Sequence, residues 1–426
     1  MKLKSLILEI AKETAALEFL SDLVKRGPFK NKVFLAGGSP RDMQLGMKPK
    51  DLDVVVKGGI NAGIEFAEWA AKEIGNYKAG SNPVIFPTYG TAKFTLQGVN
   101  HMGHDLSDVD VEAVAPRKEK YTPGSRKPEV SGGELADDVQ RRDFTVNSLL
   151  HDLTTGEVLD LTGLGKEDIK AGIVRTPLDP DIIFTDDPLR ILRAVRFTAK
   201  YNWKLPMFMI RAIKKNASQL TNISKERIHD EANKMLLTDF PFKAFRMLQI
   251  FGLMKYVFPS LSKVNLDHMK QMKELKPILQ LRLIATHAHN RVESVQGEMT
   301  ELRYSLDIIK VVVNTLKQLP EFMKNTSTME DEYLRKLAYF SPEVASYLFA
   351  YGHAYADNFN VYETEERYGE IEDQLKANPL PVTGNDLVAL GMKPSPEFKK
   401  IIDTFKAMYI KNPLTPREEY LKLVRR

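Results

Sequence analysis

Residues 37–56, GGSPRDMQLGMKPKDLDVVV, connect two apolar runs, Val33–Ala36 and Asp53–Val56. Short apolar runs bounded by turn residues predict buried β-strands. The glycine pair between them, followed by Arg41 and Asp42, predicts a turn that opens a short helix. The stretch therefore predicts a strand, a helix and a second strand that begins with acidic residues.

The second predicted strand carries two carboxylates at its start. Alternate side chains of a strand point to the same face, so Asp51 and Asp53 are expected side by side while Leu52 enters the core. Adjacent carboxylates repel unless a proton or cation neutralises them, and Mg²⁺ takes one or two such ligands. A third acid, Glu112 in the strand-like VDVEAVA, could complete a metal site. Taken alone, each acid also fits an ordinary solvated strand end.

The composition is that of an ordinary globular protein. The 426 residues are 43% hydrophobic and 27% charged, carry a net charge of +5 and include no cysteine. No apolar run is long enough for a membrane span, and the lack of thiols excludes disulfides and thiolate metal sites, so a cytoplasmic location is expected. The mild positive charge permits an anionic partner. Glu9, Lys12, Glu13 and Glu18 interrupt the apolar N-terminus and favour an amphipathic helix over a signal peptide.

Strand and helix signals are mixed in the first part of the chain, and amphipathic helical patterns dominate after Asp160. This change predicts a mixed head followed by a long helical body. The segment Arg117–Gly133 is polar and rich in glycine, proline and serine, which predicts a mobile loop. Further elements predicted within the head are a helix, Asn61–Ile74, and two strands, Thr91–Leu96 and Val109–Val114.

Two stretches of the head could bind a phosphorylated ligand. The turn at Gly37 and Gly38 would offer backbone N–H groups to a phosphate, and Arg41 would add a forked, permanently charged donor. The pattern matches neither the dinucleotide fingerprint nor the P-loop. In RRDFTVNSLL, residues 141–150, an arginine could bind a triphosphate and Asp143 a ribose hydroxyl. Alternatively, Asp143 would cap a helix formed by the apolar residues that follow, and the arginines would be solvated.

A third stretch, TDDPLRILRAVRF at residues 185–197, combines a helix cap with a row of arginines. Asp187, Arg190 and Arg193 fall opposite the predicted core face, and Arg196 lies nearer to its edge. A capped helix with a basic surface explains this pattern. A coplanar Asp187 and Arg190 would do more, because a carboxylate only accepts hydrogen bonds and a guanidinium only donates them. Such a pair would select bases with an amino group beside a ring nitrogen, and so admit CTP and ATP while rejecting UTP and GTP.

Taken in order over about residues 30–260, these stretches resemble the class II tRNA nucleotidyltransferases, the CCA-adding enzymes, which share their catalytic head with bacterial poly(A) polymerases. Two positions depart from the family pattern: Asp186 replaces the usual glutamate, and Ser148 replaces a commoner alanine. The matching motifs are GGxxRD at Gly37–Asp42, DxD at Asp51–Asp53, RRDFTxN at Arg141–Asn147, a DxxGxxD-like segment from Asp160 to Asp168, DDPLR at Asp186–Arg190 and the neck motif SKERIHDE at Ser224–Glu231.

The resemblance implies an α+β fold, with a polymerase-β-like nucleotidyltransferase head (a small mixed sheet with helices) followed by an all-α neck, body and tail. Basic stretches such as Lys263–Lys276 and Lys422–Arg426 are expected to bind tRNA phosphates. The implied divisions are an N-terminal helix at 1–28, the head at 29–160, the neck with the base-reading motif at 161–260, and the tRNA-binding body and tail at 261–426.

By position in the motifs, the resemblance also implies residue roles. Asp51 and Asp53 would bind two Mg²⁺ ions, and Glu112, a looser match, would join them as a catalytic acid. The nucleotide-binding residues would be Gly37, Gly38, Arg41 and Arg142 at the triphosphate, Asp143 at the ribose, Asp187 and Arg190 at the base, and Asn147, Arg193 and Arg196 in support.

The implied activity is template-independent addition of C, C and A to tRNA 3′ ends from CTP and ATP, with pyrophosphate released by a two-metal mechanism. A poly(A) polymerase, or an enzyme that adds only CC or only A, would share these motifs. A non-catalytic RNA-binding protein and a small-molecule nucleotidyltransferase are further alternatives. His287 and His289 lack the His-Asp signature of the phosphohydrolase domain found in some relatives, so no hydrolase site is expected. The sequence leaves the oligomeric state open.

Overall fold

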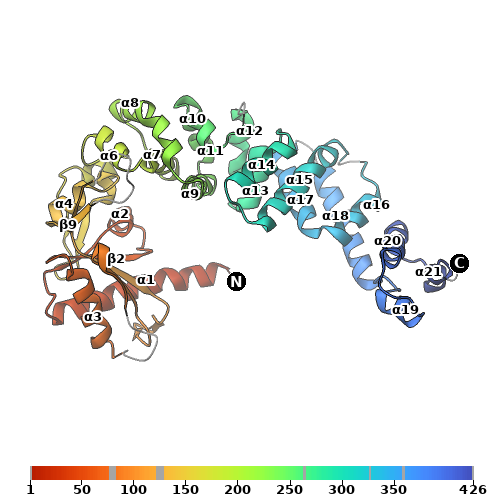
Figure 1. Ribbon diagram of the computed structural model, residues 1–426, viewed down its shortest axis with the longest axis horizontal. Helices are drawn as coiled ribbons and strands as arrows, with labels where there is room; N and C mark the ends of the chain where they lie inside the picture. The colour runs from red at the N-terminus through yellow and green to blue at the C-terminus, as the bar shows by residue number, and fades with distance from the viewer. Residues whose placement is uncertain are drawn as a thin grey trace. The chain divides into compact units, whose positions relative to one another are not determined.

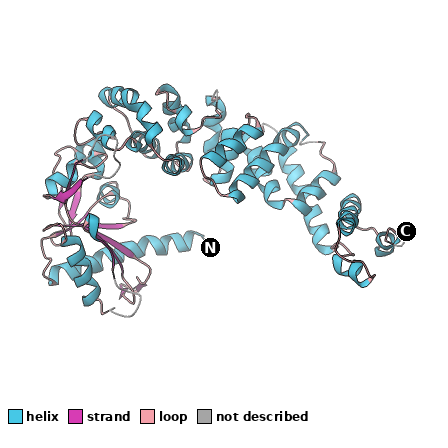
Figure 2. Cartoon of the chain, in the orientation of Figure 1, coloured by secondary structure: helices cyan, strands magenta, loops and turns pink. Residues whose placement is uncertain are grey.

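The computed structural model describes residues 2–75, 83–120, 129–261, 265–325, 328–356 and 360–424. The chain forms two compact units. The first comprises Met1–Ser224 with Ile250–Leu253, and the second comprises Lys225–Gln249 with Met254–Arg426. Within the described residues all strands belong to the first unit (Figures 1 and 2), and no helix there is both long and apolar enough to cross a membrane.

A mixed seven-stranded sheet forms the centre of the first unit, in the order β11-β10-β1-β2-β7-β4-β3. β2 and β7 are parallel, and the other neighbouring pairs are antiparallel. The four strands that the sequence predicts are confirmed as β1, β2, β4 and β7. The strands of the sheet are β1 (Val33–Leu35), β2 (Leu52–Val56), β3 (Val84–Phe86), β4 (Thr91–Thr95), β7 (Asp110–Val114), β10 (Leu150–Asp152) and β11 (Val158–Leu159).

The alternation of side chains along β2 separates the face of the sheet that packs in the main core from the face that carries Asp53, which is polar around that residue. Leu52 and Val54 enter the main hydrophobic core, which also contains apolar residues of α1 (Lys2–Arg26) and α3 (Ala62–Glu73). Asp53 and Val55 belong to the opposite face, where Val55 packs in a smaller cluster with residues of α4 (Leu135–Gln140). Asp53 therefore lies outside the main core, although its neighbours along β2, Leu52 and Val54, are buried.

Two expectations for the head are wrong. The sequence predicts a loop over Arg117–Gly133, but β8 (Arg117–Lys120) and β9 (Glu129–Gly132) pair as an antiparallel ribbon. Backbone hydrogen bonds hold this ribbon together, and its strands do not show the alternation of apolar residues from which a strand is predicted. Residues 121–128 lie outside the described residues. The helix that would follow Asp143 is a single 3₁₀ turn, η2 (Thr145–Asn147), because pairing with β1 draws the next residues into β10.

Helices complete the first unit, together with a short ribbon of β5 (Asn100–His101) and β6 (His104–Asp105) that contacts α1. On α7 (Leu189–Lys200), Leu192, Val195 and Ala199 are buried and form part of the core face that the sequence predicts opposite its row of arginines. The remaining elements are α2 (Gly38–Gln44), α5 (Gly165–Ala171), α6 (Pro180–Asp186), α7 (Leu189–Lys200) and α8 (Met207–Asn216), with the 3₁₀ turns η1 (Pro87–Tyr89) and η3 (Ala217–Asn222).

The described part of the second unit is built from helices, which confirms the predicted helical region. They are α9 (Lys225–Leu236), α10 (Pro241–Ile250), α11 (Met254–Val257), α12 (Leu266–Gln271), α13 (Leu279–His287), α14 (Val292–Glu301), α15 (Leu306–Asn325), α16 (Asp331–Phe340), α17 (Pro342–Tyr355), α18 (Asn360–Ala377), α19 (Gly384–Ala389), α20 (Pro396–Lys411) and α21 (Arg417–Lys422), with the 3₁₀ turn η4 (Met272–Glu274).

Candidate active site

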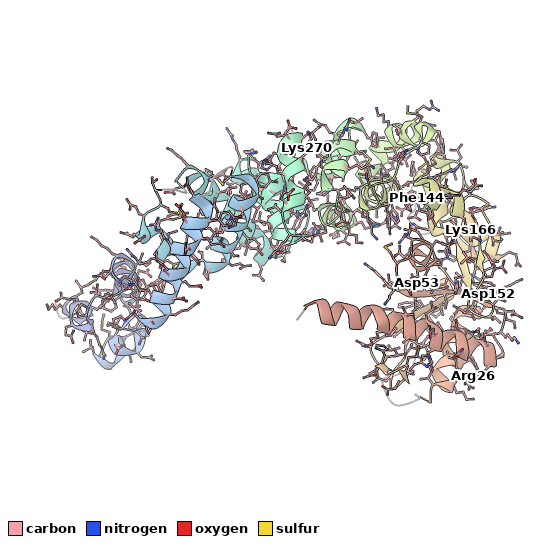
Figure 3. The ribbon with its side chains drawn as sticks, turned by 180° about the vertical axis from the view of Figure 1, so that it is seen from behind. Arg26, Asp53, Phe144, Asp152, Lys166 and Lys270 are labelled. Atoms are coloured by element: carbon pink, nitrogen blue, oxygen red, sulfur yellow. The ribbon has the colours of Figure 1, made fainter. Side chains whose placement is uncertain are left out.

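Asp53 lies on the polar face of the sheet beside an acid of the neighbouring strand. In the parallel pairing of β2 with β7, Asp53 is the register partner of Glu112. Leu52 is only 2% exposed, so the predicted alternation around it is confirmed. Asp51 immediately precedes β2 and is exposed. The structure thus brings the three predicted acids together at one end of two paired strands (Asp53 is labelled in Figure 3).

The glycine turn passes close to the Asp53 carboxylate. Gly37 has φ 72° and ψ −130°, a backbone conformation that other residues rarely adopt. A Cβ atom added there would lie 3.3 Å from Oδ2 of Asp53. The N–H of Ala36 donates to the carbonyl oxygen of Asp53 at 2.8 Å, which fixes the two segments together. Glycine is therefore needed where the backbone turns past the acid, and α2 begins at the next residue.

The surroundings of Asp53 raise the pKa of its carboxyl to about 6. Partial burial is the largest cause, followed by the negative charges of Glu112 and Asp51, while the positive charge of Arg142 opposes them. Because the side chain still reaches solvent, the protein surrounds only part of the carboxylate. A nearby cation would relieve both the repulsion and the lost hydration.

A cleft of about 490 Å³ lies at these acids. Three lysines and six acids line it, and two of the lysines already contact acids: Lys12 of α1 binds Asp108, and Lys93 of β4 binds Asp110. The excess of carboxylates favours cations in this cleft. The charged lining residues are Lys12, Glu13, Lys50, Asp51, Asp53, Lys93, Asp108, Asp110 and Glu112.

The donor set of the cleft fits Mg²⁺ that a substrate helps to hold. Asp53 and Glu112 supply hard carboxylate oxygens from neighbouring strands. In the described part of the chain, no three side chains of His, Cys, Asp or Glu form a ready-made metal group. Mg²⁺ is commonly bound by one or two carboxylates, with waters and substrate phosphates completing its shell. The acids therefore suit a catalytic ion better than a structural one.

Asp138 is buried and holds both arginines of the RRD motif. The motifs of the sequence did not point to this residue. Its Oδ1 accepts from Nε of Arg141 at 3.1 Å, and its Oδ2 accepts from Nη2 of Arg142 at 2.8 Å. Burial alone would raise the pKa of Asp138, but the charges of Arg142 and Arg141 lower it. Arg142 is thereby held where its charge acts on Asp53.

Arg41 is buried, with only 4% of its surface exposed. Its Nε donates to Oδ1 of Asp42 at 2.8 Å, and its Nη1 donates to Oδ1 of Asn147. The guanidinium carbon lies 5.1 Å from the ring centre of Phe197 and 5.0 Å from that of Tyr201. The guanidinium therefore joins α2 to α7, and the predicted contact with a triphosphate would require it to exchange partners.

Asp143 is buried and both of its oxygens have partners. Oδ1 accepts from the N–H of Phe144 and from Nδ2 of Asn147, each at 2.8 Å. Oδ2 accepts from Nε and Nη2 of Arg193, at 2.8 and 2.5 Å. Burial would raise the pKa of Asp143, but Arg193 and the hydrogen bond from Asn147 lower it. In this structure Asp143 anchors α7 to the head.

These contacts form one network around Asn147. Asn147 lies between Arg41 and Asp143, and Asp143 holds Arg193 of α7. At the other end of α7, the hydroxyl of Tyr201 donates to the aspartate beside Arg41 at 3.1 Å. Helix α7 is therefore bonded to the head at two separate points, which sets its position relative to the glycine turn and Asp53.

Asp187 and Arg190 lie at the start of α7, and both are half-buried. Oδ1 of Asp187 accepts from the N–H of Leu189 at 3.2 Å, so Asp187 also caps the helix, as the alternative interpretation predicts. Nη1 of Arg190 donates to the carbonyl oxygen of Ile183 at 3.4 Å, and its charge lowers the pKa of Asp143. The predicted base-reading pair is thus next to the buried network.

Two further cations lie along α7. The guanidinium carbon of Arg196 is 4.7 Å from the ring centre of Phe197. Lys200 donates to the hydroxyl of Tyr201 at 2.8 Å, and burial, followed by the charge of Arg41, lowers the pKa of Lys200 to about 8. No pattern in the sequence predicts this lysine–tyrosine pair. The spacing of Asp138 from the two arginines, three and four residues, could have revealed that contact.

Known proteins resemble parts of this chain. Residues 33–175 match the family model of the poly(A) polymerase head domain, and residues 209–264 match the model of the probable RNA and SrmB-binding site of polymerase A. The mitochondrial CCA tRNA nucleotidyltransferase of Saccharomyces cerevisiae is 30% identical over 277 residues, which is 61% of this chain and 49% of the relative. Over these residues the chain is similar to tRNA nucleotidyltransferases and to poly(A) polymerases.

Two other relatives are similar to the chain along most of its length. The A-adding tRNA nucleotidyltransferase of Halalkalibacterium halodurans is 25% identical over 98% of this chain and 95% of its own length. The structure of the Bacillus stearothermophilus CCA-adding enzyme in complex with CTP covers 97% of both chains, with a TM-score of 0.72 and 20% identity. This chain thus spans about half the length of the yeast relative but nearly all of the A-adding relative and of the solved CCA-adding enzyme. The likeness to the solved structure confirms the predicted fold class.

The two histidines weighed as a hydrolase signature have different surroundings in the helical unit. His287 is buried, and burial lowers its pKa to about 4. Nε2 of His289 lies 3.4 Å from Nδ1 of His268. Parts of the basic stretches predicted to bind tRNA, at 263–264 and 425–426, lie outside the described residues.

Proposed function

We propose that this chain is a template-independent RNA nucleotidyltransferase that adds C, C and A to tRNA 3′ ends from CTP and ATP. The observation that carries the proposal is the pairing of Asp53 with Glu112, beside the turn at Gly37 and near the positive charge of Arg142. Phosphoryl transfer depends mainly on positioning and on electrostatic stabilisation, and acids, backbone donors and a held guanidinium supply both.

The relatives support this activity and define its alternatives. Their names include a CCA-adding enzyme of mitochondria and a solved CCA-adding enzyme with CTP. The relative from Halalkalibacterium halodurans is A-adding, and the family model of the head is that of poly(A) polymerase. A-only addition and poly(A) synthesis are therefore the competing activities. The lack of cysteine is consistent with action in the cytoplasm.

The triphosphate would lie between the glycine turn and Arg142. Asp138 orients Arg142 through a hydrogen bond of 2.8 Å. Because the side chain is already ordered, binding of the phosphates would cost little further side-chain entropy. Arg41 and Asp143 would act from behind the nucleotide, because their polar atoms bind Asn147, Arg193 and Asp42. Their role would be to hold α7 in register with Asp53.

The base would be read at the start of α7. Asp187 accepts hydrogen bonds and Arg190 donates them, which suits the amino group and ring nitrogen of cytosine and adenine. Both side chains are half-buried, so they can meet a ligand. The proximity of Arg190 to Asp143 places this pair beside the network that ties α7 to the head.

Mg²⁺ fits the carboxylates of the cleft, with Asp53 and Glu112 as its first ligands and Asp51 beside them. When bound, the metal would lower the pKa of the RNA 3′-hydroxyl and neutralise charge on the triphosphate, and the family resemblance suggests two ions. Asp53 binds a metal only when deprotonated, and its pKa of about 6 leaves it mostly ionised at neutral pH. Its repulsion from Glu112 and Asp51 favours the metal-bound state.

The test uses a tRNA transcript that lacks its last three nucleotides. The protein and Mg²⁺ are incubated with it and with each nucleotide singly and then together, and the products are sequenced. Addition that stops after C, C and A supports the proposal. Addition of A to a second transcript that ends in CC, with no extension of the first transcript, identifies an A-adding enzyme, and a long A tail identifies a poly(A) polymerase. No extension by a folded protein would overturn the proposal and leave an RNA-binding protein.

A further inference from the structure

Lys93 continues a row of charged residues across the polar face of the sheet. In the β2–β7 pairing Asp53 is opposite Glu112, and in the β7–β4 pairing Glu112 is opposite Lys93. Ala92 and Phe94, its neighbours in β4, enter the core, so Lys93 belongs to the same face as Asp53. The three side chains therefore lie on neighbouring strands in register, and all three line the cleft.

The ammonium group of Lys93 is held in place but remains accessible. Its Nζ lies 2.7 Å from Oδ2 of Asp110, and 48% of its side chain is exposed. Oδ1 of Asp110 accepts from the hydroxyl of Thr95 at 2.7 Å, which orients the carboxylate. The hydrogen bond to Asp110 is the largest cause of a raised pKa for Lys93, so the lysine is positively charged at any working pH. The cleft thus presents an oriented cation.

The order of strands gives this row a direction. The glycine turn follows β1 and lies against Asp53, whereas Glu112 and Lys93 belong to β7 and β4 on the other side of β2. This inference rests on the proposed function, in which the triphosphate and the pyrophosphate that leaves it lie on the side of the glycine turn. In an in-line displacement the 3′-oxygen bonds to the α-phosphorus opposite the breaking bond, while its proton passes to solvent. The attacking RNA end must then approach from the side of Glu112 and Lys93.

We propose that Lys93 binds the last phosphodiester of the acceptor RNA and so positions its 3′-hydroxyl toward Asp53. The cleft at Asp53 has more acids than lysines and repels RNA phosphates, so an accessible cation on the approach side offsets this repulsion. The ion pair with Asp110 of β7 holds the ammonium group at the edge of the cleft. Lys93 would contact RNA and leave the nucleotide to Arg142.

The test compares Lys93→Met with Lys215→Met, a matched control. Lys215 is also an exposed lysine of the first unit, with its Nζ 2.6 Å from Oδ2 of Asp181 on α6. Binding of the shortened tRNA transcript is measured without nucleotide or metal over a range of salt concentrations. We expect Lys93→Met to weaken binding about threefold and to reduce the salt slope by about 0.7 to 1, while Lys93→Arg restores both. Binding of CTP with Mg²⁺ should be unchanged.

A loss of CTP affinity with unchanged RNA affinity would assign Lys93 to the triphosphate and overturn the proposal, as would equal effects of Lys93→Met and Lys215→Met. Asp110→Asn keeps the cation and should retain RNA affinity, which separates the charge from the ion pair. Because binding is measured without turnover, the result stands apart from the extension assay. A wild-type chain that binds RNA through Lys93 without extending it would contradict the proposed function only.

Discussion

Arg193 directs two guanidinium nitrogens, Nε at 2.8 Å and Nη2 at 2.5 Å, at a single oxygen of Asp143, fifty residues earlier in the chain. Asp143 is 8% exposed, so this contact compensates a buried charge. It joins the helix that carries the proposed base-reading residues to the loop that follows Arg142. The base-reading end of α7 and the acids of the sheet therefore depend on each other for position.

Arg193→Ala should destabilise the first unit by about 3 kcal/mol, because it leaves the buried carboxylate of Asp143 without its ion partner. Urea unfolding followed by tryptophan fluorescence reports on this unit, since both tryptophans of the chain, Trp69 and Trp203, lie in it. Arg211→Ala on α8 is the control and should change stability by less than about 0.5 kcal/mol. Equal effects of the two variants would contradict the structural role of the ion pair.

Asn147→Ala should cost about 2 kcal/mol, because it removes one partner each from Arg41 and Asp143 in a buried site. Asn147→Asp has nearly the same shape but places a second carboxylate beside Asp143. It should therefore be less stable than Asn147→Ala at pH 8 and recover as the pH falls and one of the two acids is protonated. An Asp variant as stable as wild type at pH 8 would show that the network tolerates the extra charge.

Asp53→Asn should stabilise the metal-free protein at pH 8 by about 1 kcal/mol after allowance for solvent screening, and abolish turnover. The raised pKa of Asp53, about 6 in the folded protein against an ordinary value of 3.8, makes its ionisation unfavourable to folding. This penalty is complete above pH 6 and vanishes below pH 3.8. Thermal unfolding of wild type and variant at pH 8 and pH 4 measures it, and a benefit that grows toward acid pH would refute the assignment.

Turnover should depend on the same group. Below pH 6, protonation of Asp53 competes with metal binding, so the Mg²⁺ concentration needed for half-maximal extension should rise about tenfold for each pH unit. The measurement is a titration of Mg²⁺ at several pH values with saturating CTP. A requirement for Mg²⁺ that does not change between pH 7 and pH 5 would exclude Asp53 as the titrating ligand.

Asp187→Asn should weaken discrimination between CTP and UTP by at least about tenfold, because an amide can donate as well as accept a hydrogen bond. Asparagine caps helices as well as aspartate does, so the cap at Leu189 and the stability of α7 should be retained. Single-nucleotide extension with the four triphosphates measures the effect. An unchanged ratio with unchanged stability would leave Asp187 with its capping role alone.

The local features of the head follow from the sequence because they depend on neighbouring residues. The alternation in β2 places Leu52 inside and Asp53 outside, and the turn at Gly37 needs a residue without a side chain. The apolar spacing of α7 predicts its buried face. Short elements are different: β10 and β11, of three and two residues, are too short for any pattern, and they form because β1 offers a partner to β10 and β10 offers one to β11.

The sequence by itself determined the fold class, through the order of its motifs, and pointed to three acids of the cleft, Asp51, Asp53 and Glu112, because strand alternation, turns and motif order are properties of the chain. Only the tertiary structure decided which charges have partners. Arg41 and Asp143 read as ligand-binding residues, yet each is buried in contact with Asn147. Lys93 had no motif at all, and its register with Glu112 gives it a place in the cleft. A charged side chain looks the same in sequence whether its partner is a ligand or a residue that folding brings beside it.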